Sequence, residues 1–341
     1  MPERLRVAIV GLDHWYAGLG ELEGTAKSNR VRIVALAHRD AAKAEATARR
    51  YGVPDWTTDY ASLVRRPDVD VVVTACQTSE NAALCQEAAR NGKHIVSVKP
   101  VAMSVSDANA IASAVHAAGV RFISFESVYR ISPLYRRIRQ WVDEGRIGSV
   151  LTAYTVLRAP LPTQIWPGEQ GRTWWLDAAK APGGGWIDHS IYHVDFLRWL
   201  LHDDVARVGG DVANVKHVDL PFEDFGAANL TFKKGGRAIV EVTWTGAPGS
   251  FLSQIHLVGQ EGQIVHDPTL TGKLAVTGKF DLSGWLLSGV PSGSSSMVEH
   301  LAEVIQDGIE PVATVDDAVK NLNACLTFYR AARESRTLDV S

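Results

Sequence analysis

Residues 5–14 read Leu5-Arg6-Val7-Ala8-Ile9-Val10-Gly11-Leu12-Asp13-His14. A continuous apolar run of this length is typical of a strand buried on both faces, and the residues from the glycine to about 28 predict a tight turn followed by a helix. The same pattern returns along the first third of the chain, with further strands expected at 31–37, 69–75, 94–98 and 120–124. Strands and helices that alternate across short loops predict right-handed βαβ units and a doubly wound parallel sheet.

The pattern changes after about residue 128. An amphipathic helix is predicted at 132–144. Strands that look antiparallel follow at 150–157, 227–232, 236–245 and 251–259. Two terminal helices are predicted at 296–307 and 315–334. The Ser/Gly-rich stretch 282–296 predicts a mobile loop. We therefore expect two domains, a parallel α/β domain over 1–127 and an α+β domain with a large, mainly antiparallel open sheet over 128–341.

Composition narrows the class of protein. The chain has 341 residues, 46% of them hydrophobic, and a net charge of −3 without a polybasic stretch, so neither a nucleic acid nor an anionic membrane is indicated as a partner. No apolar run is long enough to span a bilayer, and a strand begins too close to Met1 to leave room for a signal peptide. Three cysteines at wide spacings suggest reduced thiols, so a cytoplasmic protein is expected.

The first strand-turn-helix unit is the place where a Rossmann domain holds the pyrophosphate of a dinucleotide. Within the G-x-G-x-x-G frame only Gly11 is present, and the later glycine positions hold Asp13 and Tyr16. The strand before the turn, the helix after it and the topology still favour a nucleotide, held by Gly11, Leu12, Asp13 and His14. Alternatively, Asp13 caps the helix and places a carboxylate where the phosphate belongs.

The second strand ends in Ala37-His38-Arg39-Asp40, without the acid that binds the ribose hydroxyls of NAD. An imidazole and a guanidinium stand there instead. Arg39 suits a ribose 2′-phosphate, which favours NADP slightly over NAD. Alternatively, Arg39 is a solvated arginine beside Asp40, which caps the next helix.

Lys99-Pro100 follows a predicted strand at the carboxyl edge of the sheet, where ligands of this topology bind. A lysine there can donate to a substrate hydroxyl and move a proton. The alternative is an ordinary surface lysine before a proline.

The segment from Pro182 to Asp195 contains three consecutive glycines, Gly183 to Gly185, and then a predicted helix with four groups able to transfer protons. Glycines let backbone approach a ligand closely. On a helix, Asp188 and Tyr192 are i and i+4 neighbours, as are His189 and His193. The alternative is a capped helix whose aromatic residues belong to the core.

Two further interpretations concern the same region. His189 and His193 have a spacing that can seat a metal, but there is no HExxH motif, and we expect no metal. Three of the ten tryptophans, Trp174, Trp175 and Trp186, can stack on a substrate or fill the core.

Together these residues resemble the Gfo/Idh/MocA family of nicotinamide-dependent oxidoreductases over almost the whole chain. The matching segments are Pro67 to Val73, Gly92 to Pro100 with its lysine, Val128 to Arg137, Gly145 to Val150, Gly183 to Leu200, Glu299-His300 and Tyr329 to Ser335. The chain departs from the family pattern at Asp13, at Tyr16 and at Val98, which stands where the family usually has a glutamate.

The resemblance implies site residues. Alignment of the family's Asp-x-x-x-His helix without a gap places Asp188 at the acid and Tyr192 at the histidine, as in members similar to glucose-fructose oxidoreductase. A slip of one residue makes His193 the base and puts His189 at the position of the acid, so Tyr192 is favoured. Lys99 and Pro100 then also contact the cofactor.

The function that the resemblance implies is hydride transfer between a nicotinamide, as NADP or NAD, and a secondary hydroxyl of a sugar or cyclitol. The second domain then binds substrate and forms a homodimer or homotetramer through its open sheet face. The alternatives are an NAD-dependent member that cleaves glycosides, a nucleotide-binding sensor without catalysis, and a metal-assisted lyase or hydrolase that uses His189 and His193.

Overall fold

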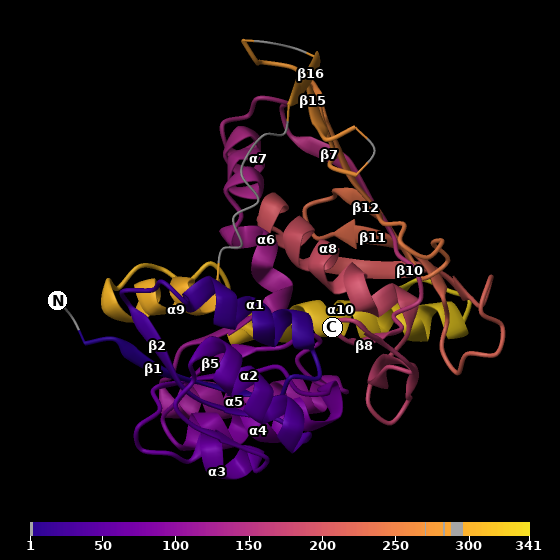
Figure 1. The fold of residues 1–341 in the computed structure, drawn as a ribbon. Helices are drawn as coiled ribbons and strands as arrows, with labels where there is room; N and C mark the ends of the chain where they lie inside the picture. The colour runs from indigo at the N-terminus through magenta and orange to yellow at the C-terminus, as the bar shows by residue number, and fades with distance from the viewer. Residues whose placement is uncertain (1–2, 270, 282–283, 288–295) are drawn as a thin grey trace. The chain divides into compact units, whose positions relative to one another are not determined.

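A computed structural model describes residues 3–269, 271–281, 284–287 and 296–341 (Figure 1). The chain forms two compact units that interleave along the sequence. Unit 1 comprises 1–131, 163–182 and 293–322, and unit 2 comprises 132–162, 183–292 and 323–341. The boundary expected after residue 127 lies where a 3₁₀ turn, η1 (Phe125–Ser127), meets α6 (Val128–Ile131).

Unit 1 is built on a six-stranded sheet in which every pair of neighbours is parallel, in the order β3-β2-β1-β4-β5-β6. This is the strand order of a dinucleotide-binding Rossmann domain, so the predicted fold class is confirmed. The strands are β1 (Leu5–Val10), β2 (Val31–Ala37), β3 (Trp56–Thr57), β4 (Val71–Thr74), β5 (His94–Ser97) and β6 (Phe122–Ser124). The helices between them are α1 (Trp15–Thr25), α2 (Ala41–Tyr51), α3 (Tyr60–Val64), α4 (Thr78–Arg90) and α5 (Val105–Ala118).

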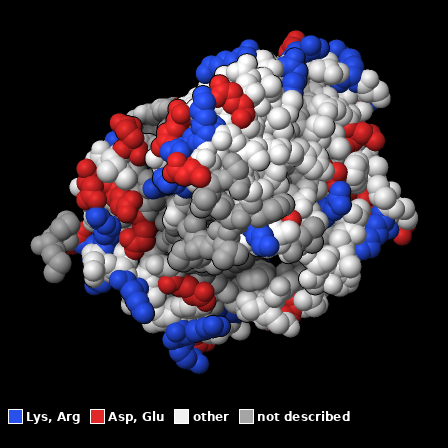
Figure 2. Space-filling model, turned by 90° about the horizontal axis from the view of Figure 1, so that it is seen from above, with Lys and Arg blue, Asp and Glu red and all other residues white. Residues whose placement is uncertain are grey.

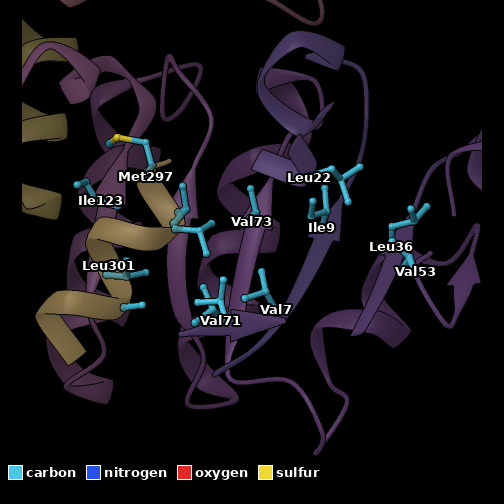
Figure 3. Close-up of a cluster of buried hydrophobic side chains, with 14 of the residues drawn as sticks. Val7, Ile9, Leu22, Leu36, Val53, Val71, Val73, Ile123, Met297 and Leu301 are labelled. Atoms are coloured by element: carbon cyan, nitrogen blue, oxygen red, sulfur yellow. The ribbon is translucent and has the colours of Figure 1, made fainter. Parts of the chain in front are cut away.

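The core of unit 1 explains why its strands read as continuous apolar runs. The central strands β1 and β4 carry side chains such as Val7, Ile9 and Val73 that are fully buried, because helices cover both faces of the sheet. Met297 and Leu301 of α9 (Met297–Gln306) join this cluster from far along the chain (Figure 3). The late helix is therefore part of the first unit.

A second late segment also belongs to unit 1. Residues 163–182 form a two-stranded ribbon, β8 (Gln164–Trp166) with β9 (Glu169–Gln170), and a 3₁₀ turn, η2 (Trp174–Leu176). A hydrogen bond joins the ribbon to α1: the Trp15 indole nitrogen donates to the Gln164 carbonyl at 3.2 Å. This segment brings tryptophans to the first turn of the Rossmann sheet.

Unit 2 contains a nine-stranded sheet in the order β16-β15-β14-β13-β7-β12-β11-β10-β17, in which only the β7–β12 pair is parallel. The α+β prediction with a mainly antiparallel sheet is confirmed. The strands are β7 (Val150–Arg158), β10 (Val205–Ala213), β11 (Phe225–Phe232), β12 (Arg237–Thr243), β13 (Leu252–Gly259), β14 (Gln263–Asp267), β15 (Lys273–Thr277), β16 (Gly284–Leu287) and β17 (Leu338–Asp339).

Helices α7 (Pro133–Asp143) and α8 (Gly185–Leu201) belong to unit 2, and α10 (Val315–Arg333) begins in unit 1 and ends in unit 2. Helix α8 packs on β11 and β12, where Val240 is fully buried and its neighbour Ile239, on the opposite sheet face, is 44% exposed. One face of the sheet is thus covered and the other carries exposed apolar side chains.

One predicted loop is partly wrong. Within the stretch 282–296, residues 284–287 form the edge strand β16, paired with β15. Residues 282–283 and 288–295 lie outside the described part of the chain. Pairing with a distant strand overrides the local Ser/Gly composition that predicted a loop.

On the face shown in Figure 2, acidic and basic side chains lie interspersed, in line with the small net charge.

Candidate active site

The turn between β1 and α1 is shaped by a single glycine. Gly11 has φ of +83°, and a Cβ on it would lie 2.7 Å from the backbone of Cys76. The Gly11 nitrogen donates to the Ala37 carbonyl at 2.8 Å, and the His14 nitrogen donates to Ala75 at 2.9 Å. The turn is therefore fixed against the ends of β2 and β4, and Gly11 is required there for both conformation and space.

Asp13 does not cap α1, contrary to one of the two sequence interpretations. The residue before α1 is His14, which makes no side-chain capping hydrogen bond. The Asp13 carboxylate instead accepts hydrogen bonds from the Arg39 guanidinium at 3.1 and 3.2 Å and from Gln77 Nε2 at 3.2 Å. The N-terminus of α1 thus lacks a side-chain cap and the nearby carboxylate is paired with a cation, an arrangement that fits a bound pyrophosphate.

Arg39 is not a free cation at the end of β2. Besides Asp13, its guanidinium contacts the carboxylate of Glu80 on α4. Burial is the largest single effect and lowers the pKa of the Arg39 guanidinium, but Asp13, Tyr60 and Glu80 act against it and together hold this pKa above its usual value. Asp40 caps α2 through the Lys43 nitrogen, as the sequence suggests, but Arg39 is held between two carboxylates.

His38 is buried and supports the same turn. Its Nδ1 accepts a hydrogen bond from the Leu12 nitrogen at 3.3 Å, and its ring lies nearly parallel to Trp166, with centroids 6.1 Å apart. Burial lowers the pKa of His38, so the imidazole is neutral and can accept from Leu12 at neutral pH.

Lys99 is a buried residue and not a surface lysine. Only 1% of it is exposed, and its Nζ lies 4.6 Å from the centroid of the Trp175 ring, a cation–π contact. The Lys99–Pro100 bond is cis. Trp174 stacks on Trp175 at 4.4 Å, and its indole nitrogen donates to the Asp13 carbonyl at 3.2 Å. The His14 ring lies 4.6 Å from Trp174.

Unit 1 therefore brings together the turn between β1 and α1, two tryptophans and a buried ammonium. Tryptophans Trp174 and Trp175, predicted as substrate or core residues, line this cluster next to Lys99 and His14. Sequence reasoning had no means of joining residue 99 to residue 175, since they meet only through tertiary structure.

In unit 2, the three glycines at the start of α8, Gly183 and Gly184 before it and Gly185 as its first residue, allow close packing of the protein itself. A Cβ on Gly183 would lie 2.4 Å from the Tyr329 hydroxyl oxygen, one on Gly184 2.3 Å from the Glu223 carbonyl oxygen, and one on Gly185 2.9 Å from the Asp224 carbonyl oxygen. The sequence predicts that this run lets the backbone approach a ligand. In the structure, the three Cβ positions instead face the loop before β11 and helix α10.

The first turn of α8 is satisfied by protein groups. The Glu223 carboxylate accepts from the backbone nitrogens of Gly184 at 3.1 Å and Trp186 at 3.0 Å and from the Tyr329 hydroxyl at 2.6 Å. The Ile187 nitrogen donates to the Tyr329 oxygen at 3.2 Å. Burial raises the pKa of both Glu223 and Tyr329. These contacts fix the start of the helix that carries Asp188.

Asp188 is 6% exposed and accepts a hydrogen bond from the Trp244 indole nitrogen at 3.0 Å. His189 Nδ1 lies 3.1 Å from the same carboxylate. Tyr192, one turn further along, is half-buried. An acid held by an indole and a partly accessible phenol thus lie on one stretch of α8.

His193 and Trp186 lie in the interior. His193 is fully buried, and burial, with a smaller effect of His189, lowers the pKa of His193 to about 3. Trp186 is also fully buried, donates to the Val240 carbonyl at 3.2 Å and packs on Phe328. Trp186 is a core residue and not a stacking platform, and His193 is poorly suited to accept a proton from a ligand.

Two family descriptions match the chain. Residues 5–125 match "Oxidoreductase family, NAD-binding Rossmann fold", and residues 135–265 match "GFO/IDH/MocA C-terminal domain". The chain belongs to the Gfo/Idh/MocA family of oxidoreductases.

Relatives within the family are similar along most of their length. The scyllo-inositol 2-dehydrogenase (NAD(+)) of Bacillus subtilis (strain 168) is 26% identical over 301 residues, which are 85% of this chain and 83% of the relative. The 1,5-anhydro-D-fructose reductase of Ensifer adhaerens is 26% identical over 322 residues, 93% of each chain. The solved structure of an aldose-aldose oxidoreductase from Caulobacter crescentus complexed with glycerol is 25% identical, with a TM-score of 0.85 over 99% of this chain and 100% of that one.

Sequence reasoning missed several residues of this Gfo/Idh/MocA oxidoreductase that support the site. Glu80 and Trp244 bond to the predicted site residues Arg39 and Asp188. Glu223 and Tyr329 fix the first turn of the helix that carries Asp188. All four lie far in sequence from their partners. Their local sequence carries no signal of this role. Among the described residues, no group of three or more His, Cys, Asp or Glu is arranged to hold a metal. In the same part of the chain, no helix has the length and apolarity needed to cross a membrane.

Proposed function

We propose that this Gfo/Idh/MocA oxidoreductase transfers a hydride between NAD and a secondary hydroxyl of a sugar or cyclitol. The observation that carries the proposal is the buried ammonium of Lys99, which lies in the Rossmann unit against Trp175. Burying an ammonium costs free energy. An ammonium in a site that excludes water is suited to hold an alkoxide-like oxygen. The names of two relatives, an inositol dehydrogenase and an anhydrofructose reductase, support the substrate class.

The first domain, 1–127, would bind the nucleotide. The turn from Gly11 through Leu12 and Asp13 to His14 and the uncapped N-terminus of α1 would hold the pyrophosphate. His38 and Arg39 would lie toward the adenosine ribose, and Lys99 with Pro100 toward the nicotinamide, following the family resemblance. When bound, the nicotinamide ring supplies the hydride acceptor for oxidation and the hydride donor for reduction.

We propose NAD in preference to NADP. The sequence argument for NADP depended on a free Arg39, whereas the Arg39 guanidinium has two carboxylate partners, Asp13 and Glu80. A 2′-phosphate would have to displace at least one of them and would face the released carboxylate, which costs free energy through like-charge repulsion. Ribose hydroxyls, which are neutral, can instead donate to these same carboxylates.

The proton that leaves the substrate hydroxyl needs a base and a stabilising cation. We propose Tyr192 as the base, because it is half-buried, whereas His193 is fully buried. Lys99 would hold the substrate oxygen and favour the phenolate, since a tyrosine with its free pKa of about 10 is a poor base at neutral pH. Asp188, fixed by Trp244, would accept a hydrogen bond from a neighbouring hydroxyl. His189 and the pair Trp174 and Trp175 would contact the substrate.

Turnover of a panel of sugars and cyclitols tests the proposal. The panel contains scyllo-inositol, 1,5-anhydro-D-fructose and common aldoses, each offered with NAD or NADH and with NADP or NADPH, and nicotinamide absorbance is followed. We expect turnover in the wild type, a loss of at least about 100-fold in kcat for Lys99→Ala and Tyr192→Phe, and most of the activity in His193→Asn. Nucleotide binding without turnover of any compound contradicts a dehydrogenase, and release of a sugar without net absorbance change indicates glycoside cleavage.

We also propose a cellular compartment and an oligomeric state for the protein. Cys76, Cys85 and Cys325 are buried and form no disulfide, which supports a reducing compartment such as the cytoplasm. The domain 128–341 would bind substrate and form a homodimer or homotetramer. Exposed Ile239 on the uncovered sheet face supports such an interface. Light scattering at several protein concentrations tests it, and a monomer at all of them contradicts it.

A further inference from the structure

Asn81 on α4 has a fully buried side chain whose donors and acceptor all have partners. Its Nδ2 donates to the Ser97 hydroxyl at 2.9 Å and to the Val101 carbonyl at 2.7 Å. Its Oδ1 lies 3.8 Å from the thiol of Cys76 and 3.6 Å from that of Cys85, within reach of weak S–H donors. A buried amide with every polar group satisfied has a defined orientation.

The two partners of Nδ2 lie on either side of Lys99. Ser97 is two residues before it and Val101 two residues after it, so a single amide bridges the whole loop. Neither anchor is on the lysine itself. Asn81 therefore constrains the path of the backbone on both sides of Lys99.

Further hydrogen bonds hold the same loop. The Val98 nitrogen donates to the Thr74 hydroxyl at 3.1 Å, and the Ser97 hydroxyl donates to the Val98 carbonyl at 3.1 Å. The Ser97 hydroxyl is thus an acceptor for Asn81 and a donor to the residue before Lys99. This chain of hydrogen bonds connects α4, β4 and the loop after β5.

We propose that Asn81 is a positioning residue for Lys99, which it places through Ser97 and Val101. The proposal rests on the role given to Lys99 under the proposed function. An error of about 1 Å in the position of a catalytic group can cost about 100-fold in rate without changing which groups are present. Loss of Asn81 is therefore expected to lower kcat more than it raises KM.

Asn81→Leu tests this, since leucine has a similar size but no polar group. The matched control is Asn321→Leu, which removes another fully buried asparagine of unit 1, one whose Nδ2 donates to Glu126 at 2.9 Å. We expect Asn81→Leu to lose about 10- to 100-fold in kcat, with KM and the Kd for NADH within about threefold of wild type. Asn321→Leu is expected to lower the thermal midpoint without this loss in kcat.

The decisive comparison repeats Asn81→Leu in a Lys99→Ala background. If Asn81 acts through Lys99, the second substitution lowers the residual kcat by no more than about twofold, because the group that it positions is gone. An equal loss in both backgrounds overturns the proposal, as does wild-type kcat in Asn81→Leu. Full activity of Lys99→Ala alone instead contradicts the proposed function, so the two failures are distinguishable.

Ser97→Ala provides a second test should Asn81→Leu fail to fold. It removes one of the two anchors and creates only a small cavity. We expect a smaller loss of kcat, about three- to tenfold, which again disappears in the Lys99→Ala background. A loss that persists without Lys99 overturns the proposal.

Discussion

The indole nitrogen of Trp244, the residue directly after β12, donates a 3.0 Å hydrogen bond to the carboxylate of Asp188 on α8. Both side chains are buried. The acid proposed to bind substrate is therefore oriented by a residue 56 positions away in the chain. Hydrogen bonds to a charged group are stronger than those between neutral groups.

Trp244→Phe removes this bond and keeps most of the apolar contact. A hydrogen bond to a charged group contributes about 1.5–3 kcal/mol, so we expect kcat/KM for the sugar substrate to fall about 10- to 100-fold. Trp186→Phe is the matched control, since it loses a hydrogen bond to the Val240 carbonyl in the same unit. It is expected to lower stability without a comparable loss of kcat/KM. Equal effects of both variants contradict the role of Trp244.

The pairing of Arg39 with Asp13 and Glu80 predicts cofactor choice. We expect the wild type to prefer NAD to NADP by at least about tenfold in kcat/KM, because two carboxylates oppose a 2′-phosphate. Glu80→Gln leaves Arg39 with one carboxylate and is expected to reduce this preference several-fold. The preference is measured as the ratio of kcat/KM with each nucleotide.

Glu87→Gln is the control for cofactor choice. It removes one negative charge from the same helix, but Glu87 contacts Arg65 and Arg90 and not Arg39. The ratio of kcat/KM with NAD to kcat/KM with NADP should be the same in Glu87→Gln as in the wild type. A wild type that prefers NADP, or a ratio that responds equally to both substitutions, refutes the account of Arg39.

Buried His193 should make stability depend on pH. Its pKa is lowered to about 3, whereas a free imidazole has a pKa of about 6.5, so the unfolded chain binds the proton more readily. The contribution is therefore present above about pH 6.5 and is lost as the pH falls toward 3. Each pH unit in this window costs up to about 1.4 kcal/mol for this group.

Denaturant unfolding at pH 7 and at pH 5 measures this effect. The wild type should lose more free energy of unfolding between the two than His193→Asn, in which the titrating group is absent. Identical losses would show that His193 is not the group responsible.

The glycines before α8 predict a contrast in stability. A Cβ on Gly184 would lie 2.3 Å from the Glu223 carbonyl oxygen and 2.5 Å from Phe222 Cβ. Gly184→Ala should therefore cost at least about 1–3 kcal/mol through overpacking against backbone. Gly20, within α1, has nothing within 4 Å of its Cβ position, and Gly20→Ala should stabilise by about 0.5–1 kcal/mol. Thermal or denaturant unfolding compares them, and a neutral Gly184→Ala contradicts the packing.

The parallel sheet could be predicted because its strands are short apolar runs separated by helices, a pattern that is local and strong. Unit 2 was less predictable. Strand β10 contains two glycines within Val205–Ala213, and β16 lies in a Ser/Gly-rich stretch, so both depend on partners distant in sequence. The assignment of 163–182 and 293–322 to unit 1 has no local signal.

In the candidate site, too, local sequence indicates single residues but not their distant partners. Lys99, Asp188 and Tyr192 could be found because each follows a recognisable strand or glycine run. The partners that define their chemistry could not, since Arg39 meets Glu80, and Asp188 meets Trp244, only in the folded chain. The glycine run shows in the sequence that space is needed there, but not whether a ligand or the protein itself fills that space.

Transfer of deuterium tests the central claim most directly. The protein is incubated with NAD and a cyclitol or sugar that turns over in the panel, deuterated at its hydroxyl-bearing carbons, and the nicotinamide is analysed by mass spectrometry. The account predicts that one deuterium moves to the reduced nicotinamide in the wild type and that this transfer is lost in Lys99→Ala. Consumption of the deuterated compound with no label in the nicotinamide would contradict a hydride-transfer dehydrogenase.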